Sequence, residues 1–304
     1  MVTNTVLITG SNGFIGSSLL ARFGKLGKTV ALDCGPVDMT GLAAHYVSMR
    51  LPHPGIKQVM AHFKPRTIVH CAGTASVPQA IAHPDADFRS GPETVFQLLD
   101  AIRQSGIETT FIFPSSAAVY GNPRQLPIEE DAATAPISPY GYHKLICEKI
   151  IEEHQQLYNI SAVILRIFSC YGEGLQKQLL WDLCRKMHTG KLELFGTGEE
   201  TRDFVHIRDL VRVIELVTER TEKNLILNVA SGRQSSIRQV VDLVLRAFGS
   251  DVQPVFNNIA RAGDPTHWAA DITRLTELGF RAEVTLPDGI SQYVRWFKKA
   301  HAPA

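Results

Sequence analysis

Near its start the chain reads VLITGSNGFIG, from Val6 to Gly16. The opening VLIT is an apolar, β-branched run typical of a buried parallel strand, and an amphipathic helix pattern follows from about Phe14. Gly10 permits a tight turn, Gly13 lets a pyrophosphate approach the backbone, and Gly16 lets the helix pack closely on the strand. The spacing is GxxGxxG rather than GxGxxG, so a purely structural turn is the alternative to a dinucleotide-binding unit.

Asp33 ends the next apolar run, seventeen residues after Gly16. A carboxylate in this place accepts hydrogen bonds from the ribose hydroxyls of the adenosine and repels a 2′-phosphate, which favours NAD over NADP. Two alternatives stay open. Asp33 precedes Cys34-Gly35-Pro36 and is also compatible with an ordinary turn, and Arg50 could lie near the adenosine and accommodate NADP.

The first half of the chain alternates apolar runs with amphipathic stretches, which indicates βαβ units and a parallel sheet. The predicted fold is α/β, a Rossmann-type doubly wound parallel sheet that binds NAD over residues 1–166. A returning segment at about 204–232 is expected to add one more strand, Leu225–Val229. We predict the other strands at Val6–Thr9, Thr29–Leu32, Thr67–His70, Phe111–Phe113 and Ala162–Leu165, and helices at about 14–25, 55–64, 92–105 and 139–158.

Helices predominate after about Arg166. We therefore predict a smaller, mostly helical C-terminal substrate lobe made of residues 167–203 and 233–304. The helix candidates of the later chain are Gln178–His188, Ile207–Glu219, Ser236–Phe248, Asp271–Leu278 and Leu286–Lys299.

Length and charge limit the class of protein. The 304 residues are enough for about two domains, and 31 lysines and arginines nearly balance 30 aspartates and glutamates. We therefore expect no broad basic surface for nucleic acid or anionic lipid. The first residues run into an apolar strand without a charged leader, and no apolar run approaches the ~18 residues of a membrane span.

Cysteine and histidine usage favours a reducing cytoplasm and no bound metal. The five cysteines are odd in number, scattered, and never spaced as CxxC. The eleven histidines show no HExxH spacing. We expect a cytoplasmic protein whose thiols are structural.

Tyr140 and Lys144 stand four residues apart in SPYGYHKLICEKI, downstream of a serine-bearing strand end, FIFPSSAAVYG. Positions i and i+4 share a helix face, so the ammonium can lie beside the phenol and favour its ionised form. A phenol ordinarily titrates near pH ~10, so a tyrosinate base near neutrality needs about 4 kcal/mol of electrostatic stabilisation. The alternative is an ordinary aromatic residue at a helix start. Tyr142 is a nearby decoy, but only Tyr140 precedes a lysine by four residues.

Four motifs, GxxGFIG, SSxxVYG, YxxxK and a later RDFVHIRDL, occur in this order, and the match extends from about residue 5 to 297. In this combination the chain resembles the extended short-chain dehydrogenase/reductase family, in its branch of nucleotide-sugar epimerases and dehydratases. The resemblance implies NAD as cofactor, a nucleotide-diphosphate sugar bound between the lobes, and a homodimer built on the helices at 92–105 and 139–158. It implies a cofactor site made of Gly10, Gly13, Phe14, Ile15, Gly16, Asp33, Ala72, Gly73, Tyr140 and Lys144.

The same resemblance assigns the catalytic trio to Ser116, Tyr140 and Lys144. Tyrosinate at Tyr140 is expected to remove the proton of a sugar hydroxyl while the carbon beneath gives hydride to the nicotinamide. Ser116 is expected to hydrogen-bond the same oxygen, and Lys144 also to hold the nicotinamide ribose. Ser115 is the rival for the serine role, but the motif places the catalytic hydroxyl four residues before Tyr120.

Ala117 and Ala118 follow the catalytic serine. Family members that are 4,6-dehydratases carry acidic residues there, because elimination of water needs an acid and a base, and methyl groups cannot transfer protons. This leaves an NAD-dependent epimerase that oxidises the sugar transiently at C4 and returns hydride to the opposite face. The alternatives are an NAD(P)H-dependent 4-keto-sugar nucleotide reductase, a uronic-acid decarboxylase and a non-catalytic NAD-binding protein.

For the substrate, the resemblance implies contacts from the second lobe. The guanidinium groups of Arg202 and Arg261 suit the oxygens of a diphosphate, and the alternative for each of them is an ordinary surface salt bridge. Asp203 and Asp209 are expected to be structural. The implied substrate-binding residues are Ser116, Ser169, Arg202, Arg261 and Asp264.

Several positions depart from the family pattern. A substrate-contacting asparagine is Ser169 here, the usual NVxGT reads Ser90-Gly91-Pro92-Glu93-Thr94, and an aspartate near the adenine is missing around Met49-Arg50-Leu51. Trp268 stands where family members gate the sugar pocket, and its bulk is expected to disfavour N-acetyl sugars. We therefore expect a divergent member, whose sugar and nucleotide base the sequence does not identify.

Overall fold

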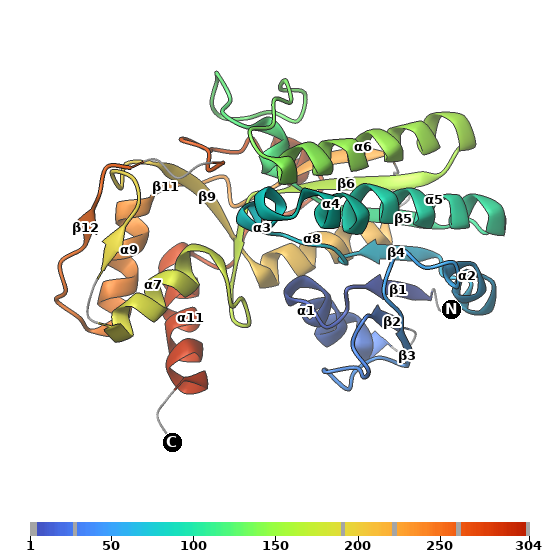
Figure 1. Ribbon diagram of the computed structural model, residues 1–304, viewed down its shortest axis with the longest axis horizontal. Coiled ribbons are helices and arrows are strands. Elements are labelled where there is room, and N and C mark those ends of the chain that lie inside the picture. Colours follow the sequence, from blue (N-terminus) through green and yellow to red (C-terminus); the bar gives the residue numbers. More distant parts are fainter. Residues whose placement is uncertain (1–4, 27–28, 190–191, 221–223, 260–262, 302–304) are drawn as a thin grey trace. The chain divides into compact units, whose positions relative to one another are not determined.

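A computed structural model describes residues 5–26, 29–189, 192–220, 224–259 and 263–301 (Figure 1). The chain divides into two compact units. The first contains Met1–Gly121, Ala133–Ile167 and Val211–Leu227, and the second contains Asn122–Ala132, Phe168–Leu210 and Asn228–Ala304. The sequence-based domain boundaries stay a prediction, and the two units are described separately below.

A seven-stranded sheet organises the first unit, with strand order β10-β6-β5-β4-β1-β2-β3. The five strand pairs from β6 to β3 are all parallel, so the predicted Rossmann-type sheet is confirmed. The predicted return of the later chain to the sheet is also confirmed, as β10 at its edge. The strands are β1 (Val6–Thr9), β2 (Thr29–Asp33), β3 (His45–Ser48), β4 (Thr67–His70), β5 (Thr110–Ser116), β6 (Ser161–Ile167) and β10 (Leu225–Val229).

Helices cover both faces of this sheet. Because side chains alternate across a strand, Leu7 and Phe111 point to one face, where they join a buried apolar cluster with α2 (Ile56–Phe63), α5 (Thr94–Ser105) and α6 (Pro139–Tyr158). Figure 1 shows α5 and α6 running alongside β5 and β6. The alternate residue Ile8 is also fully buried, and α1 (Phe14–Phe23) contacts β1 and β2.

The predicted helix at 92–105 begins two residues late, for a local reason. Pro92 has no backbone N–H to donate, and it lies in a π-helical segment, Arg89–Glu93, that leads into α5. Two further short helices, α3 (Val77–Ala82) and α4 (Pro84–Phe88), precede this segment and had not been predicted. The connection after β4 is therefore more helical than the sequence pattern indicated.

The start of α6 is fixed by its sequence. The Ser138 hydroxyl accepts a hydrogen bond from the N–H of Gly141 at 3.2 Å, and Pro139 occupies the first helical turn. Asn159, with a left-handed backbone, ends the helix after twenty residues. This helix carries Tyr140 and Lys144, so its starting point determines where both side chains lie.

The second unit mixes helices with short strands. A three-stranded sheet has the order β11-β9-β7, and β8 pairs with β12. A mostly helical lobe was predicted, and no strand was named in it, because strands of two to six residues give too little periodicity. The strands are β7 (Ser169–Tyr171), β8 (Glu193–Leu194), β9 (Thr201–His206), β11 (Gln234–Ser236) and β12 (Val255–Phe256). The helices are α7 (Gln178–Thr189), α9 (Ile237–Phe248), α10 (Thr273–Glu277) and α11 (Leu286–Ala300), while α8 (Ile207–Glu219) runs from this unit into the first.

The described residues contain no membrane-spanning helix, no metal cluster and no disulfide. Among their helices, none has the length and apolarity to cross a bilayer. They contain no group of three or more histidine, cysteine, aspartate or glutamate side chains arranged to hold a metal ion. Each of the five cysteines is a free thiol.

Candidate active site

The glycine turn after β1 is shaped by contacts that exclude side chains. Gly10 has a φ of +66°, and a Cβ on it would lie 2.5 Å from the backbone nitrogen of Ala72. A Cβ on Gly16 would lie 2.1 Å from the carbonyl oxygen of Gly10. The turn is closed by the N–H of Gly13, which donates to the Gly10 carbonyl at 3.0 Å. Glycine is therefore required at 10 by backbone conformation and at 16 by close packing.

The amino end of α1 is open to an anionic ligand. Gly13 caps the helix without a side chain, and the first turn, with Phe14 and Ile15, holds no acidic residue. The first N–H groups of a helix lack intrahelical partners and carry partial positive charge. These residues fit the pyrophosphate of a dinucleotide.

Asp33 lies beside this turn. Its carboxylate accepts hydrogen bonds from the N–H of Asn12 at 3.0 Å and of Gly35 at 3.3 Å. Each carboxylate oxygen has two lone pairs, so both can accept a further hydrogen bond from a ribose hydroxyl. The Asp33 carboxylate can therefore stabilise the turn and still bind the ribose of a dinucleotide, so the two interpretations of this residue are compatible.

The loop after β4 contains Ala72 and Gly73. The N–H of Ala72 donates to the hydroxyl of Thr9 at 3.3 Å, and Gly73 has a φ of +116°. The Thr9 hydroxyl also lies 2.7 Å from Nδ1 of the buried His70. Burial, together with the positive charge of Lys144, lowers the pKa of His70 to about 3, so this imidazole is neutral.

The structure distinguishes the two neighbouring serines at the end of β5. Ser115 is buried, and its hydroxyl donates to the Glu148 carboxylate at 2.5 Å. Ser116 is partly exposed, and its hydroxyl oxygen accepts the N–H of Ala118 at 3.2 Å. Among the described residues the Ser116 hydroxyl makes no other hydrogen bond, so its proton can be donated to a ligand, whereas the proton of Ser115 is already donated to Glu148.

Tyr140 and Lys144 occupy successive turns of α6, and both side chains are partly exposed. The Lys144 ammonium donates to the carbonyl of Pro114 at 2.8 Å and lies 4.5 Å from the ring centroid of Phe113. The decoy Tyr142 is 54% exposed. The lysine charge is therefore fixed against the end of β5, one helical turn beyond Tyr140.

The carboxylate that accepts the Ser115 hydrogen bond belongs to a buried ion pair, which had not been predicted from the sequence. Arg166 on β6 donates to Glu148 on α6, through Nε at 3.2 Å and Nη2 at 2.8 Å. Burial opposes the charge of Arg166, but the hydrogen bonds and charge of Glu148 outweigh it and hold the pKa of the guanidinium above its usual value. Nη1 of Arg166 donates to the Tyr120 hydroxyl at 2.9 Å.

A second polar cluster joins the loop after β4 to α6. The buried carboxylate of Asp87 accepts from the Thr74 hydroxyl and lies 2.6 Å from Nδ1 of His143. His143 stands between Tyr140 and Lys144 on α6, and the ring of Phe88 packs edge-on against it. Periodicity along the chain could not indicate this contact, because Asp87 and His143 are 56 residues apart.

Arg202, in β9 of the second unit, is held differently. Its Nη1 donates to the carbonyls of Thr201 at 2.8 Å and Thr266 at 3.3 Å, and its guanidinium lies 5.7 Å from the ring centroid of Trp268. Burial lowers the pKa of Arg202, although the charges of Asp264 and Glu200 oppose the change. Within the described residues no carboxylate hydrogen-bonds to this guanidinium.

The other predicted substrate residues of this unit vary in placement. Ser169 opens β7 and is partly exposed, Asp264 is exposed, and Arg261 lies outside the described residues. Trp268 is only 8% exposed and packs edge-on against Phe168. Its role in gating a sugar pocket stays a prediction.

Asp203 and Asp209 serve the fold, as predicted. The buried Asp203 carboxylate accepts from the N–H and hydroxyl of Ser231 at 2.9 and 2.8 Å. Asp209 accepts from the N–H groups of Glu283 and Val284 at 3.1 and 3.0 Å. Both carboxylates thus stabilise backbone turns of the second unit.

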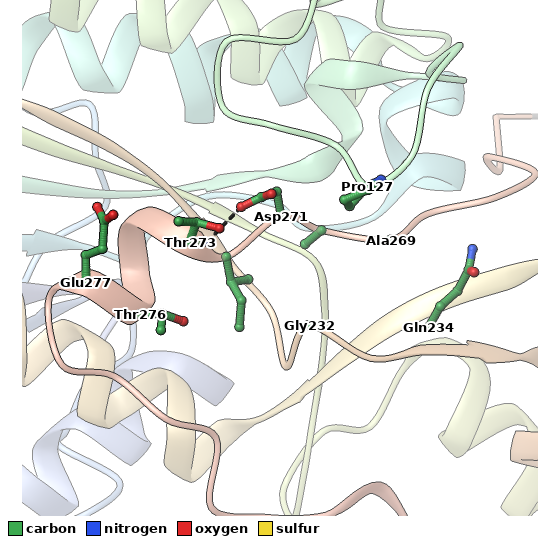
Figure 2. Close-up of a pocket in the computed structure, with 10 residues that line it drawn as sticks. Pro127, Gly232, Gln234, Ala269, Asp271, Thr273, Thr276 and Glu277 are labelled. Carbon is green, nitrogen blue, oxygen red and sulfur yellow. Dashed lines mark hydrogen bonds between the residues drawn. The ribbon is translucent and has the colours of Figure 1, made fainter.

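A separate cavity of about 350 Å³ lies within the second unit (Figure 2). Its lining includes Asp271 and Glu277 but no lysine, arginine or histidine. The Asp271 carboxylate is occupied by the N–H of Thr273, at 2.7 Å, at the start of α10. This cavity does not fit a diphosphate. It is lined by Pro127, Gly232, Gln234, Ala269, Ala270, Asp271, Ile272, Thr273, Thr276 and Glu277.

The chain is similar to known proteins over most of its length. A sequence profile of the NAD dependent epimerase/dehydratase family matches residues 6–230. The UDP-glucose 4-epimerase of Azospirillum brasilense is 30% identical over 312 residues, which cover 94% of this chain and 89% of that protein.

Solved structures are similar over the full length. UDP-glucose 4-epimerase from Thermotoga maritima, with UDP-glucose, has a TM-score of 0.90 at 27% identity and covers 97% of this chain and 99% of its own. MoeE5 in complex with UDP-glucuronic acid and NAD has a TM-score of 0.90 at 28% identity and covers 98% of this chain and 100% of its own.

Proposed function

The chain belongs to the NAD dependent epimerase/dehydratase family, and from this premise we propose that it is a 4-epimerase of a nucleotide-diphosphate sugar. Its cofactor is NAD. The main support for the proposal is the set of side chains at the end of β5 and the start of α6. Ser116, with an available hydroxyl proton, precedes two alanines, while Tyr140 and Lys144 follow on one helix.

Tyr140 is the proposed base. It takes the proton of the sugar C4 hydroxyl as hydride leaves C4, and it returns a proton to the oxygen when the alcohol is re-formed. Bound NAD supplies the hydride acceptor for oxidation of C4 and, in its reduced form, the donor for the reverse step. Lys144, whose ammonium donates to the Pro114 carbonyl, is proposed to hold the nicotinamide ribose.

Ser116 is proposed to donate its hydroxyl proton to the C4 oxygen. This assignment over Ser115 is supported by the hydrogen bond from Ser115 to Glu148, which already uses the other hydroxyl proton. The hydrogen bond from Ser116 orients the C4 oxygen toward Tyr140 as charge develops on it.

The residues after Ser116 favour epimerisation over dehydration. Ala117 is fully buried and Ala118 partly buried, and neither methyl group can donate or accept a proton. Elimination of water from a 4-keto sugar needs proton transfer at two further carbons. Oxidation and reduction at C4 need only the trio and NAD.

The second unit is proposed to bind the nucleotide diphosphate. Among the described residues, Arg202 donates only from Nη1, to backbone carbonyls, so its other guanidinium N–H groups are proposed to bind phosphate oxygens. Arg261 is proposed to bind phosphate oxygens as well, Asp264 to bind the ribose, and Ser169 to contact the substrate where family members have asparagine. The similar structures contain UDP-glucose and UDP-glucuronic acid, so uridine-diphosphate sugars are the first substrates to assay.

The test combines ligand analysis with a substrate panel. Denatured protein is examined for released NAD, and native protein is incubated with nucleotide sugars while the C4 isomers are separated. We expect isomer formation without net consumption of NAD, and a loss of about 10²- to 10⁴-fold in kcat for Tyr140→Phe. Tyr142→Phe, on the exposed side of the same helix, serves as the matched control and should retain activity.

Other outcomes would identify the competing functions. Stoichiometric oxidation of NADH or NADPH with a 4-keto sugar indicates a reductase, and release of carbon dioxide from a uronic acid indicates a decarboxylase. Full activity of Tyr140→Phe in any of these assays contradicts the proposed chemistry.

A homodimer in the cytoplasm completes the proposal. Exposed apolar side chains on α5 and α6, Phe96 at 50%, Leu157 at 68% and Tyr158 at 46%, favour burial against a second copy of the chain. Free thiols are typical of a reducing compartment. Sedimentation of the purified protein should give a dimer, and Phe96→Glu should weaken it; a monomeric wild-type protein at micromolar concentration would exclude this association.

A further inference from the structure

We propose that the buried Glu148–Arg166 ion pair is a positioning device that fixes Ser116 and Lys144 relative to Tyr140. This inference rests on the proposed function, because it assigns the pair to the geometry of that catalytic trio. Neither side chain is itself proposed to touch the sugar or NAD.

The pair continues the functional face of α6. Tyr140, Lys144 and Glu148 follow at intervals of four residues, so they lie along one face of the helix. Lys144 donates to the carbonyl of Pro114, and Glu148 accepts from the hydroxyl of Ser115. Two successive turns of the helix are thereby bonded to two successive residues of β5, and the next residue is Ser116.

Arg166 extends the contact to the other side of Ser116. Its Nε and Nη2 bond to Glu148, its Nη1 bonds to the Tyr120 hydroxyl, and its guanidinium lies 4.9 Å from the ring centroid of Tyr120. Ser115 and Tyr120 therefore both connect to one ion pair, and they enclose the short turn that begins at Ser116. The network holds that turn from both ends.

Stability alone does not account for the arrangement. Both side chains are almost fully buried, at 4% exposure for Glu148 and 7% for Arg166. Replacement of such a buried pair by apolar side chains of similar size is often neutral or stabilising. Methionines in these places cannot make the directional hydrogen bonds to Ser115 and Tyr120, so the turn at Ser116 would be held less firmly. A displacement of about 1 Å in a reacting group can lower the rate roughly 10²-fold.

The test replaces both charges together. The double variant Glu148→Met/Arg166→Met should fold and retain NAD, because no buried charge is left without a partner. We expect its kcat to fall roughly 10²-fold with KM for the nucleotide sugar changed less than about threefold. The matched control is Arg22→Met/Glu215→Met, which removes an ion pair of the same unit at 2.8 Å, between α1 and α8, and should keep kcat.

Two further measurements keep the proposal testable. The NAD content of each purified variant shows whether the cofactor site is intact, and we expect the double variant to retain as much NAD as the wild type. If the double variant does not fold, Ser115→Ala removes one hydrogen bond of the network and should lower kcat about tenfold without moving KM.

The outcomes separate the two proposals. Wild-type kcat in a folded double variant, or in folded Ser115→Ala, would overturn the positioning role. A wild-type protein that epimerises no sugar in the panel would instead overturn the proposed function.

Discussion

Two arginines, one in each unit, have different hydrogen-bond partners, and their pKa values are shifted in opposite directions. Arg166 in the first unit is hydrogen-bonded to a buried carboxylate and a phenol, and its pKa is raised. Arg202 in the second unit bonds to backbone carbonyls, lies near an indole ring, and has its pKa lowered by burial. Among the described residues, Arg166 is hydrogen-bonded to a carboxylate, whereas Arg202 feels the charges of Asp264 and Glu200 without a hydrogen bond to either. A guanidinium of the first kind is held in place by the protein, and one of the second kind can still bind an anionic ligand.

The largest expected effect concerns stability. Arg166→Met leaves the Glu148 carboxylate buried without its counter-charge, so the free energy of unfolding should fall by about 3–5 kcal/mol. Chemical denaturation of the wild type and the variant measures this change.

Arg202→Met provides the contrast. It removes no partner of a buried carboxylate, so the unfolding free energy should change by less than about 1 kcal/mol. The KM for the nucleotide sugar should rise roughly 10- to 100-fold, because a hydrogen bond to a charged group contributes about 1.5–3 kcal/mol. Equal losses of stability in the two arginine variants would break the comparison.

His70 shows what happens to a buried titratable group that, among the described residues, has no carboxylate partner: it stays neutral. Its pKa is lowered from 6.5 to about 3 in the folded protein, so the unfolded chain binds the proton more readily. The contribution of the neutral His70 imidazole to the unfolding free energy is therefore complete above pH 6.5 and decreases as the pH falls toward 3. At pH 4 the unfolding free energy should be lower by about 3 kcal/mol. The unfolding free energy of His70→Asn should show a correspondingly weaker acid dependence between pH 7 and pH 4.

The exposed His83 supplies the control for that measurement. Its replacement by asparagine should leave the acid dependence as in the wild type. An unaltered pH profile in His70→Asn would mean that other groups dominate acid unfolding.

The smallest expected effect compares one helix cap in each unit. Ser138 caps α6, and Ser236 caps α9 with a reciprocal hydrogen bond from its own N–H to the Gln239 side chain. Substitution of either serine by alanine should cost about 1 kcal/mol in unfolding free energy. Only Ser138→Ala should also lower kcat, because Tyr140 lies in the turn that Ser138 begins; the same loss of kcat in Ser236→Ala would contradict this.

Much of the first unit could be predicted because its signals are local. The strands Val6–Thr9 and Thr67–His70 and the helix Pro139–Tyr158 have the predicted bounds, since apolar runs, caps and glycines are read from neighbouring residues. The strands of the second unit, such as Thr201–His206, were missed because they are short and partly polar. Asp87 and His143 could not be paired in advance, since nothing local indicates a contact across 56 residues.

The parallel sheet, the glycine turn and the shared helix face of Tyr140 and Lys144 could all be predicted from neighbouring residues, because strand and helix periodicity fix which side chains share a face. Only the tertiary structure decided between Ser115 and Ser116, and between the fates of Arg166 and Arg202. Those choices depend on which buried partner satisfies each polar group, and the partners come from segments far apart in the chain.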